Sequence, residues 1–553
     1  MGNFSSLHRN EIMEEMKRKE LDLLVIGGGI TGSGIALDAV TRGLQTAVLE
    51  MQDFAAGTSS RSTKLVHGGL RYLKQFEIRM VAEVGKERAI VYENGPHVTT
   101  PEWMLLPFHE GGTFGPFTTN IGLRVYDYLA GVKRGERRKM LSPEKTLQLE
   151  PLLKKDGLKG AGYYVEYKTD DARLTIEVIK KAVEKGAHAI NYVKVTSFIY
   201  DDHGKVIGVK AEDQTTVDIH NIYAKKIINA CGPWVDILRE LDGSKHGKHL
   251  HLTKGVHLVF SQERFPLQQA VYFDTPDGRM VFAIPRDGKT YVGTTDTTYK
   301  GEIAHPTMTK EDRGYILEAI NYMFPSLRVK EEDVESSWAG IRPLIAEDGK
   351  KPGKISRRDE IFISKSGLIS MAGGKLTGYR KMAEQAVDTV VSQLKDELGI
   401  IYSQSETKTL PISGGEVNGS KGFQQFMKGK VKQGVELGIA EEIARKLVKR
   451  YGANVDKVFN LYETRKLEAD EEGIDAVVFA ELCYGLEYEL VYKPTDFFIR
   501  RTGALFFDID WVREHKESVM LYMRKQLSFK AERNINFVHE LERLLKEAVE
   551  PAE

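Results

Sequence analysis

The sequence predicts an α/β protein that begins with a parallel sheet and ends in a helical region. Three observations support this. A glycine-rich turn near residue 27 joins an apolar run to a helical pattern, strand-like runs recur as far as about residue 372, and from about Gln404 the pattern is helical. Because 553 residues are too many for one compact core, we expect two or three domains.

Composition is that of an ordinary globular protein. Lys+Arg and Asp+Glu both number 79, and this balance argues against a nucleic-acid partner, which usually calls for a basic excess. The two cysteines, Cys231 and Cys483, exclude a disulfide framework and fit a reducing compartment such as the cytoplasm. No apolar run is long enough to span a membrane. The polar first 20 residues predict a short surface helix, with a weak interfacial membrane anchor as the alternative.

A strand–turn–helix–strand unit opens the fold. Leu23–Ile26 suits a buried parallel strand, the helical spacing after it ends at Gly43, and Thr46–Leu49 forms a second strand. The intervening turn, GGGITG, fits the G-x-G-x-x-G pattern of dinucleotide-binding proteins, and an acid, Glu50, closes the second strand.

Each glycine of this turn has a separate role. Gly27 permits the tight turn, Gly29 lets the backbone approach a pyrophosphate, and Gly32 lets helix and strand pack closely. The helix N-terminus offers N–H groups to the phosphates, and Glu50 is placed to bind ribose hydroxyls. The motif does not separate FAD from NAD.

The stretch TSSRSTKLVHGGLRYL, from Thr58 to Leu73, follows soon after. Its hydroxyls and amides suit a pyrophosphate and a flavin ring, and His67 and Arg71 would approach that ring. Together with NACGPWVD (229–236), AGIRPL (339–344) and AGGKLTGYR (372–380), this stretch resembles the FAD-dependent glycerol-3-phosphate dehydrogenases. The resemblance runs from about residue 21 to about residue 501.

The resemblance implies three domains. They are a glutathione-reductase-type α/β FAD-binding domain (18–80, 160–250 and 335–400), an α+β substrate domain (81–159 and 251–334) and an all-α C-terminal domain (404–553). It further implies oxidation of sn-glycerol 3-phosphate to dihydroxyacetone phosphate, with electrons passing to a membrane quinone. Peripheral attachment to the inner face of the cell membrane and a homodimer stay open.

Cofactor contacts are expected from every one of these motifs. The 189–200 strand would meet the adenine through its backbone at Val195, and a helix beginning near Lys375 would stabilise the reduced flavin. The predicted cofactor-binding residues are Gly27, Gly29, Gly32, Glu50, Thr58, Ser59, Ser60, Lys64, His67, Gly68, Val195, Ala230, Gly232, Gly340, Gly374, Lys375, Leu376 and Thr377. No metal-ligand cluster is evident.

Oxidation of a secondary alcohol needs a base and cationic anchors for the phosphate. Histidine has the most suitable pKa for the base, so we place His67 first and His257 second, although His257 fits a structural role better. The predicted anchors are Arg71, Arg342 and Lys375, and Tyr72 is expected to add a hydrogen bond. The alternative for Arg342 is a surface ion pair with Glu347 or Asp348.

Two further interpretations compete with this one. The first is a glycerol-3-phosphate oxidase that uses O2, and the second is a flavin-binding regulatory protein without turnover. Elsewhere, Gly278–Asp296 predicts two strands around an Asp287-Gly288 turn, and residues 438–462 predict two helices interrupted at Gly452. The C-terminal helices could cap the active site, form an oligomer surface or contact the membrane.

Overall fold

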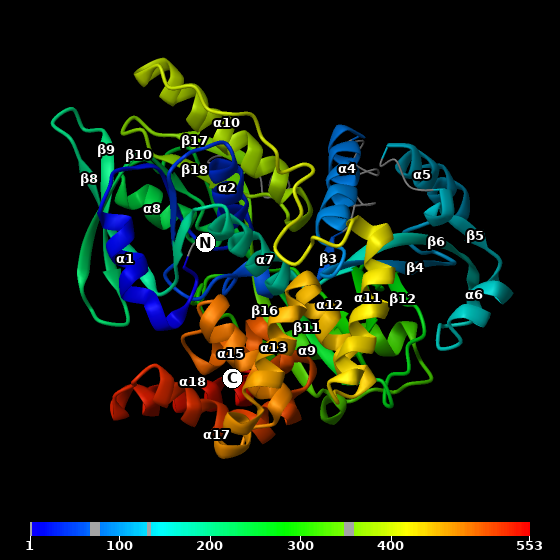
Figure 1. Ribbon diagram of the computed structural model, residues 1–553. Helices are drawn as coiled ribbons and strands as arrows, with labels where there is room; N and C mark the ends of the chain where they lie inside the picture. The colour runs from blue at the N-terminus through cyan, green and yellow to red at the C-terminus, as the bar shows by residue number, and fades with distance from the viewer. Residues whose placement is uncertain (1–2, 67–77, 130–133, 348–358, 553) are drawn as a thin grey trace.

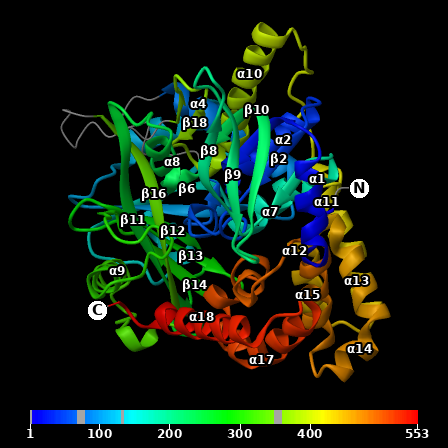
Figure 2. The same ribbon diagram turned by 90° about the vertical axis from the view of Figure 1, so that its left-hand side faces the viewer.

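The computed structural model describes residues 3–66, 78–129, 134–347 and 359–552. The predicted site residues His67, Gly68, Arg71 and Tyr72 therefore lie outside the described residues. Two sheets lie side by side in Figure 1, and the last two helices of the chain, α17 (Ile509–Gln526) and α18 (Ala531–Val549), lie at the bottom of the molecule. Figure 2 shows the same arrangement from the side, with α17 and α18 at the base.

The first sheet has eight strands among the described residues, in the order β17-β18-β10-β1-β2-β7, with β8 and β9 continuing from β10. Strands β18, β10, β1, β2 and β7 are parallel, and every residue of β1 is buried, as the predicted apolar run requires. The strands are β1 (Leu21–Ile26), β2 (Thr46–Leu49), β7 (His188–Ile190), β8 (Val193–Tyr200), β9 (Val206–Asp213), β10 (Ile219–Asn229), β17 (Glu360–Ile363) and β18 (Ile369–Ala372).

Helix α2 (Ile30–Thr41) follows β1 and packs between α7 (Asp171–Glu184) and α10 (Tyr379–Leu398). The packing against α10 is close, since a Cβ on Gly34 would lie 2.9 Å from the Tyr379 ring. The predicted strand–turn–helix–strand unit is confirmed, and β2 coincides with the predicted Thr46–Leu49.

The second sheet has ten strands in the described chain, in the order β15-β11-β14-β13-β12-β4-β6-β3, with β16 on β11 and β5 on β6. The predicted strand pair around Asp287-Gly288 is confirmed by β13 and β14. The strands are β3 (Leu65–Val66), β4 (Thr99–His109), β5 (Lys139–Leu141), β6 (Leu158–Thr169), β11 (Lys248–Ser261), β12 (Ala270–Asp274), β13 (Met280–Arg286), β14 (Lys289–Gly293), β15 (Thr297–Thr298) and β16 (Ser336–Glu347). Strands β6 and β16, which fall in the predicted FAD-domain ranges, thus pair within this sheet.

The remaining helices surround the sheets and form the C-terminal region. Outside that region they are α1 (Arg9–Lys17), α4 (Ile78–Asn94), α5 (Pro116–Leu129), α6 (Pro143–Leu149), α8 (Val235–Leu241) and α9 (Lys310–Met323). The C-terminal helices are α11 (Gly419–Glu436), α12 (Glu441–Tyr451), α13 (Val455–Thr464), α14 (Lys466–Glu471), α15 (Ala476–Tyr488), a π-helix (Asp496–Arg501), α16 (Ala504–Phe507), α17 (Ile509–Gln526) and α18 (Ala531–Val549). The predicted interruption at Gly452 separates α12 from α13.

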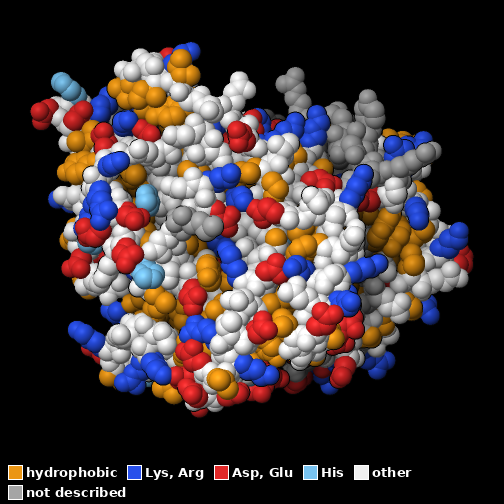
Figure 3. Space-filling view, in the orientation of Figure 1, with side chains coloured by type: hydrophobic (Ala, Val, Ile, Leu, Met, Phe, Trp, Pro, Cys, Tyr) orange, Lys and Arg blue, Asp and Glu red, His pale blue; other side chains and the backbone are white. Residues whose placement is uncertain are grey.

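The N-terminal helix α1 is held by the protein itself. Its apolar side chains Ile12, Met13 and Met16 are buried, and the helix contacts β7 and β10. This apolar face is therefore occupied within the fold. None of the described helices is both long enough and apolar enough to cross a bilayer. Basic and acidic side chains are interleaved over the described part of the face in Figure 3, in keeping with the net charge of +0.

Candidate functional site

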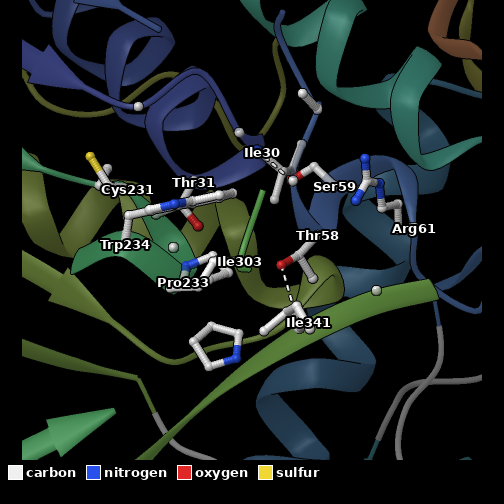
Figure 4. Close-up of a pocket in the computed structure, with 18 of the residues that line it drawn as sticks. Ile30, Thr31, Thr58, Ser59, Arg61, Cys231, Pro233, Trp234, Ile303 and Ile341 are labelled. Atoms are coloured by element: carbon white, nitrogen blue, oxygen red, sulfur yellow. Dashed lines mark hydrogen bonds between the residues drawn. The ribbon is translucent and has the colours of Figure 1, made fainter. Parts of the chain in front are cut away.

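A cavity of about 730 Å³ lies where the two sheets meet. Its wall combines the β1–α2 turn, the segment after β2, the start of β8, the end of β10, β16 and the turn after β18. Figure 4 shows how these segments converge, with Ile30, Thr31, Ser59 and Trp234 around one part of the space and Ile341 at another. Regions far apart in the sequence thus share one enclosure.

In the β1–α2 turn, backbone atoms of different residues approach one another so closely that only glycine fits. Gly27 has a φ of +110°, and a Cβ on it would lie 2.6 Å from the Ala230 carbonyl oxygen. A Cβ on Gly32 would lie 1.9 Å from the Gly27 oxygen, which no side chain can accommodate without moving the turn. The N-cap residue of α2, Gly29, and its first residues Ile30 and Thr31 line the cavity, so the helix N-terminus lies at the cavity wall.

Glu50 closes β2 beside this turn. Its carboxylate accepts hydrogen bonds from the Gly28 N–H at 2.6 Å and the Gln52 N–H at 2.7 Å. Burial raises the pKa of Glu50 to about 7, and these two backbone donors only partly oppose the rise. Glu50 lines the cavity.

The segment from Thr58 to Lys64 passes between the sheets and ties them together. Ser59 Oγ accepts from the Ile30 N–H at 3.0 Å, and Thr58 Oγ1 donates to the Ile341 carbonyl at 2.7 Å (Figure 4). A Cβ on Gly340 would lie 2.3 Å from the Arg61 oxygen, so β16 needs a glycine at this crossing. This contact brings β16 to the cavity.

Lys64 and Ser60 fix this segment through contacts outside the cavity wall. The Lys64 ammonium donates to Asp171 at 2.6 Å and to the Ser60 carbonyl at 2.9 Å, and its side chain is buried. Asp171 also accepts from the Ser62 N–H and hydroxyl. Lys64, Ser60 and Gly32 were predicted as cofactor contacts, but they do not belong to the described cavity wall.

The turn after β18 supplies another helix start. Gly373 and Gly374 have positive φ, at 72° and 90°, and a 3-10 turn (Leu376–Gly378) then leads into α10. Lys375 and Thr377 line the cavity with them. The predicted helix start near Lys375 is thus observed, with a 3-10 turn at its head.

Arg342, on β16, points into the cavity from the second sheet. Its guanidinium donates to Thr294 Oγ1 at 2.9 Å and to the Thr295 carbonyl at 3.1 Å, and Asp296 lies 3.3 Å away. Gly255 makes room for it, since a Cβ there would lie 2.3 Å from Arg342 Nη2. A fixed fork of donors is the arrangement that recognises phosphate or carboxylate groups.

His257 is a buried neighbour of Arg342. Its ring stacks on Trp338 with centroids 4.7 Å apart, and its Nε2 shares a hydrogen bond of 3.0 Å with Thr63 Oγ1. Within the described part of the chain, its Nδ1 has no hydrogen-bond partner. Burial, with help from the charges of Arg342 and Lys64, lowers the pKa of His257 well below the usual value, so the ring is neutral.

Sequence reasoning missed several residues of the wall. Arg61 lines the cavity, and burial lowers its pKa to about 10; it lies inside the TSSRST stretch, where basic character was a usable signal. Trp234 and Ile303 were missed as well: Trp234 lies inside the NACGPWVD motif, which was a usable signal, whereas no motif marks Ile303.

The predicted residues that line the cavity come from the turns after β1, β2, β10 and β18 and from strands β8, β11 and β16. They are Gly27, Gly29, Glu50, Thr58, Ser59, Val195, Ala230, Gly232, His257, Gly340, Arg342, Gly374, Lys375, Leu376 and Thr377. Among the described residues, no group of three or more His, Cys, Asp or Glu side chains is arranged to hold a metal ion.

Comparisons with known proteins cover the whole chain. Residues 22–380 match the family model for FAD dependent oxidoreductase, and residues 405–534 match that for the C-terminal domain of alpha-glycerophosphate oxidase. The chain is 62% identical over 550 residues to the aerobic glycerol-3-phosphate dehydrogenase of Bacillus subtilis (strain 168), covering 100% of this chain and 99% of that protein. It is 56% identical over 546 residues to the enzyme of the same name from Staphylococcus haemolyticus (strain JCSC1435), covering 98% of each.

Solved structures agree with these matches. The glycerol-3-phosphate dehydrogenase from Bacillus halodurans, complexed with FAD, superposes with a TM-score of 0.87 at 54% identity, over 100% of this chain and 99% of that chain. An L-alpha-glycerophosphate oxidase from Mycoplasma pneumoniae shares only the fold, with a TM-score of 0.55 at 18% identity over 70% of this chain and 97% of that one. The matches confirm the predicted fold class and FAD as the cofactor.

Proposed function

Because the chain belongs to the FAD-dependent oxidoreductases and, among them, to the aerobic glycerol-3-phosphate dehydrogenases, we propose that it oxidises sn-glycerol 3-phosphate to dihydroxyacetone phosphate and passes the electrons to a membrane quinone. One observation carries the proposal. The cavity that holds the glycine-rich turn and Glu50 also holds Arg342 and Lys375, which come from two other segments. Residues suited to a dinucleotide cofactor and cationic residues suited to a phosphate therefore line the same cavity.

The residues present fit FAD. A side chain at Gly27 or Gly32 would collide with neighbouring backbone, which leaves the start of α2 open to a pyrophosphate. Glu50 offers carboxylate oxygens for ribose hydroxyls, and the helix start at Leu376 offers N–H groups at the other end of the cavity. When bound, FAD supplies the acceptor for a hydride from the substrate carbon.

The substrate phosphate is assigned to Arg342 and Lys375. A dianion gains most from fixed cationic donors, and Thr294 and Thr295 orient the Arg342 guanidinium before any ligand arrives. Pre-orientation of this kind reduces the entropy lost on binding and holds the reacting carbon in place. Arg71, which lies outside the described residues, is proposed as a third anchor.

The base that removes the hydroxyl proton is assigned to His67, also outside the described residues. The environment of His257 supports this order, because a pKa lowered well below the usual value makes that ring a poor proton acceptor. His257 instead holds Thr63 and packs on Trp338. His67→Ala should mainly lower kcat, and steady-state kinetics with normal turnover would remove His67 from this role.

The electron acceptor separates a dehydrogenase from an oxidase. Anaerobic addition of glycerol 3-phosphate should bleach the flavin absorbance, and a soluble quinone should then restore it much faster than air does. Peroxide formation at the rate of substrate oxidation would instead indicate the oxidase. No bleaching at all would leave only a flavin-binding protein without turnover.

An enzyme that reduces a quinone dissolved in a bilayer must contact the membrane, and helix α5 has an exposed apolar face suited to this contact. Phe117, Ile121 and Val125 are 77%, 50% and 37% exposed, and their spacing of four places them on one helical face. The exposed Arg124 and Arg137 lie close by in sequence and suit anionic lipid. Phe117→Asp should weaken flotation with anionic vesicles while dye-linked activity in solution stays unchanged; unchanged flotation would contradict this surface.

A further inference from the structure

The loop after β2 has two sides. Glu50, Gln52 and Gly57 line the FAD cavity, whereas Asp53 is 0% exposed and lies outside the cavity wall. Phe54 packs beneath the glycine-rich turn, since a Cβ on Gly28 would lie 2.5 Å from its ring. Any shift of Asp53 would therefore move the residues that surround the nucleotide.

The back of this loop is held by the C-terminal region. Asp53 accepts two hydrogen bonds from Arg501, at 2.7 and 3.0 Å, and another from Arg500 Nε. Asn191, in the β7–β8 turn, donates to the same carboxylate at 2.9 Å. Arg500 and Arg501 are only 7% and 2% exposed, so these contacts are shielded from water.

The two arginines are themselves fixed. Both belong to the π-helix, a rare geometry that often occurs at functional sites. Arg500 Nη2 donates to Asp496 at 2.6 Å, and Arg501 Nη2 donates to the Glu489 carbonyl at 2.7 Å. Asp496 in turn accepts from the Tyr492 N–H at 2.9 Å. The pair therefore presents rigid donors to the loop rather than mobile side chains.

A second connection reaches the other side of the nucleotide. Tyr192 donates its hydroxyl to Asp496 at 2.5 Å, and its N–H donates to the Gln52 carbonyl at 2.9 Å. The following strand, β8, lines the cavity at Val193 and Val195. We call the part of the cavity lined by the β1–α2 turn, the loop after β2 and the start of β8 the nucleotide end. The π-helix thus contacts two of the segments that enclose it.

We propose that Arg500 and Arg501 of the C-terminal helical region are positioning residues for FAD, acting through Asp53 and the loop that carries Glu50. The sequence leaves open whether this region caps the active site, forms an oligomer surface or contacts the membrane. In the role proposed here, the C-terminal region raises the affinity for FAD by holding the loop after β2 on the side that faces away from the cavity.

Arg501→Gln tests the proposal by FAD titration of the apoenzyme, followed through flavin fluorescence. We expect the FAD dissociation constant to rise at least tenfold, while the KM for glycerol 3-phosphate at saturating FAD stays within twofold. Arg465→Gln is the matched control, because Arg465 pairs with Glu487 and Glu468 inside the C-terminal region. It should lower the melting temperature without changing FAD affinity.

A double-mutant cycle separates this role from general stabilisation. In an Asp53→Asn background, Arg501→Gln should change FAD affinity by less than twofold, because the partner through which it acts is already altered. FAD affinity within twofold of the parent in Arg501→Gln, equal weakening in Arg465→Gln, or fully additive effects would each overturn the proposal. If Arg501→Gln does not fold, Asp53→Asn and Arg501→Lys must each weaken FAD at least threefold.

Discussion

The two ends of the cavity are built in different ways. The nucleotide end is formed by the β1–α2 turn, the segment after β2 and the start of β8, with Gly27 and Ser59 fixed by close backbone contacts. The end proposed to hold the substrate is formed chiefly by the side chains of Arg342 and Lys375, which come from separate segments. Substitutions at the nucleotide end should therefore weaken FAD binding. Substitutions at the end proposed to hold the substrate should leave FAD bound and impair substrate binding or turnover.

The nucleotide end itself contains two buried carboxylates in opposite states. Burial raises the pKa of Glu50 to about 7, and the backbone N–H groups of Gly28 and Gln52 only partly oppose the rise. Burial would also raise the pKa of Asp53, but the charges of Arg501 and Arg500 outweigh it and hold that pKa at about 2. Burial thus favours the neutral form of Glu50, whereas the two arginines favour the charged form of Asp53.

The largest expected effect is at Gly32. Gly32→Ala places a methyl group 1.9 Å from the Gly27 oxygen, and the backbone there can give way only by opening the turn. We expect FAD affinity to fall by more than about 100-fold, on the scale of an overpacking cost of ~3 kcal/mol. The FAD content of the purified protein, read from its absorbance, checks this. A protein saturated with FAD would contradict the account of this turn.

Arg342→Ala should affect the opposite end. Hydrogen bonds to charged groups contribute about 1.5–3 kcal/mol, so KM should rise ~10- to 100-fold with kcat less affected. FAD content should remain that of the parent. Steady-state kinetics provide the measurement, and an unchanged KM would remove Arg342 from the phosphate site.

Glu50 predicts a pH dependence of FAD binding. Ribose hydroxyls donate to the charged carboxylate, so binding should lower the pKa of Glu50 from about 7 and release a proton. FAD should therefore bind ~tenfold more weakly at pH 6 than at pH 8. Titrations of the apoenzyme at both pH values test this. Glu50→Gln should remove most of the difference, and a flat profile in the parent would contradict the assignment.

A smaller effect is expected at Gly255. A Cβ at Gly255 would lie 2.3 Å from Arg342 Nη2 and 2.4 Å from Thr294 Oγ1, so Gly255→Ala should displace these two side-chain ends from each other, change stability little and raise KM about fivefold. Gly314→Ala is the control, because a Cβ there meets nothing within 4 Å. Equal KM values for the two variants would show that the position of the Arg342 guanidinium does not matter.

The sequence predicted the nucleotide end well because its signals are local. The 46–49 strand and the tight glycine turn follow from periodicity and spacing within thirty residues, and the structure contains both. Glu50 lines the cavity, and its role toward the ribose stays a prediction. The resemblance added Arg342 and Lys375, which do line the cavity, although their roles remain predictions.

Long-range side-chain contacts could not be predicted. Lys64 looked like a cofactor ligand, but its ammonium is committed to Asp171 on α7. The pairing of Asp53 with Arg501 joins residues 448 positions apart, and no local pattern announces such a contact. The membership of β6 in the second sheet is equally non-local.

A crystal structure of the FAD-bound enzyme with glycerol 3-phosphate would test the central claim most directly. The account predicts phosphate oxygens within hydrogen-bond distance of Arg342 and Lys375, with the second carbon of the substrate facing the flavin ring. A phosphate held elsewhere, with both cations turned away from it, would contradict the account.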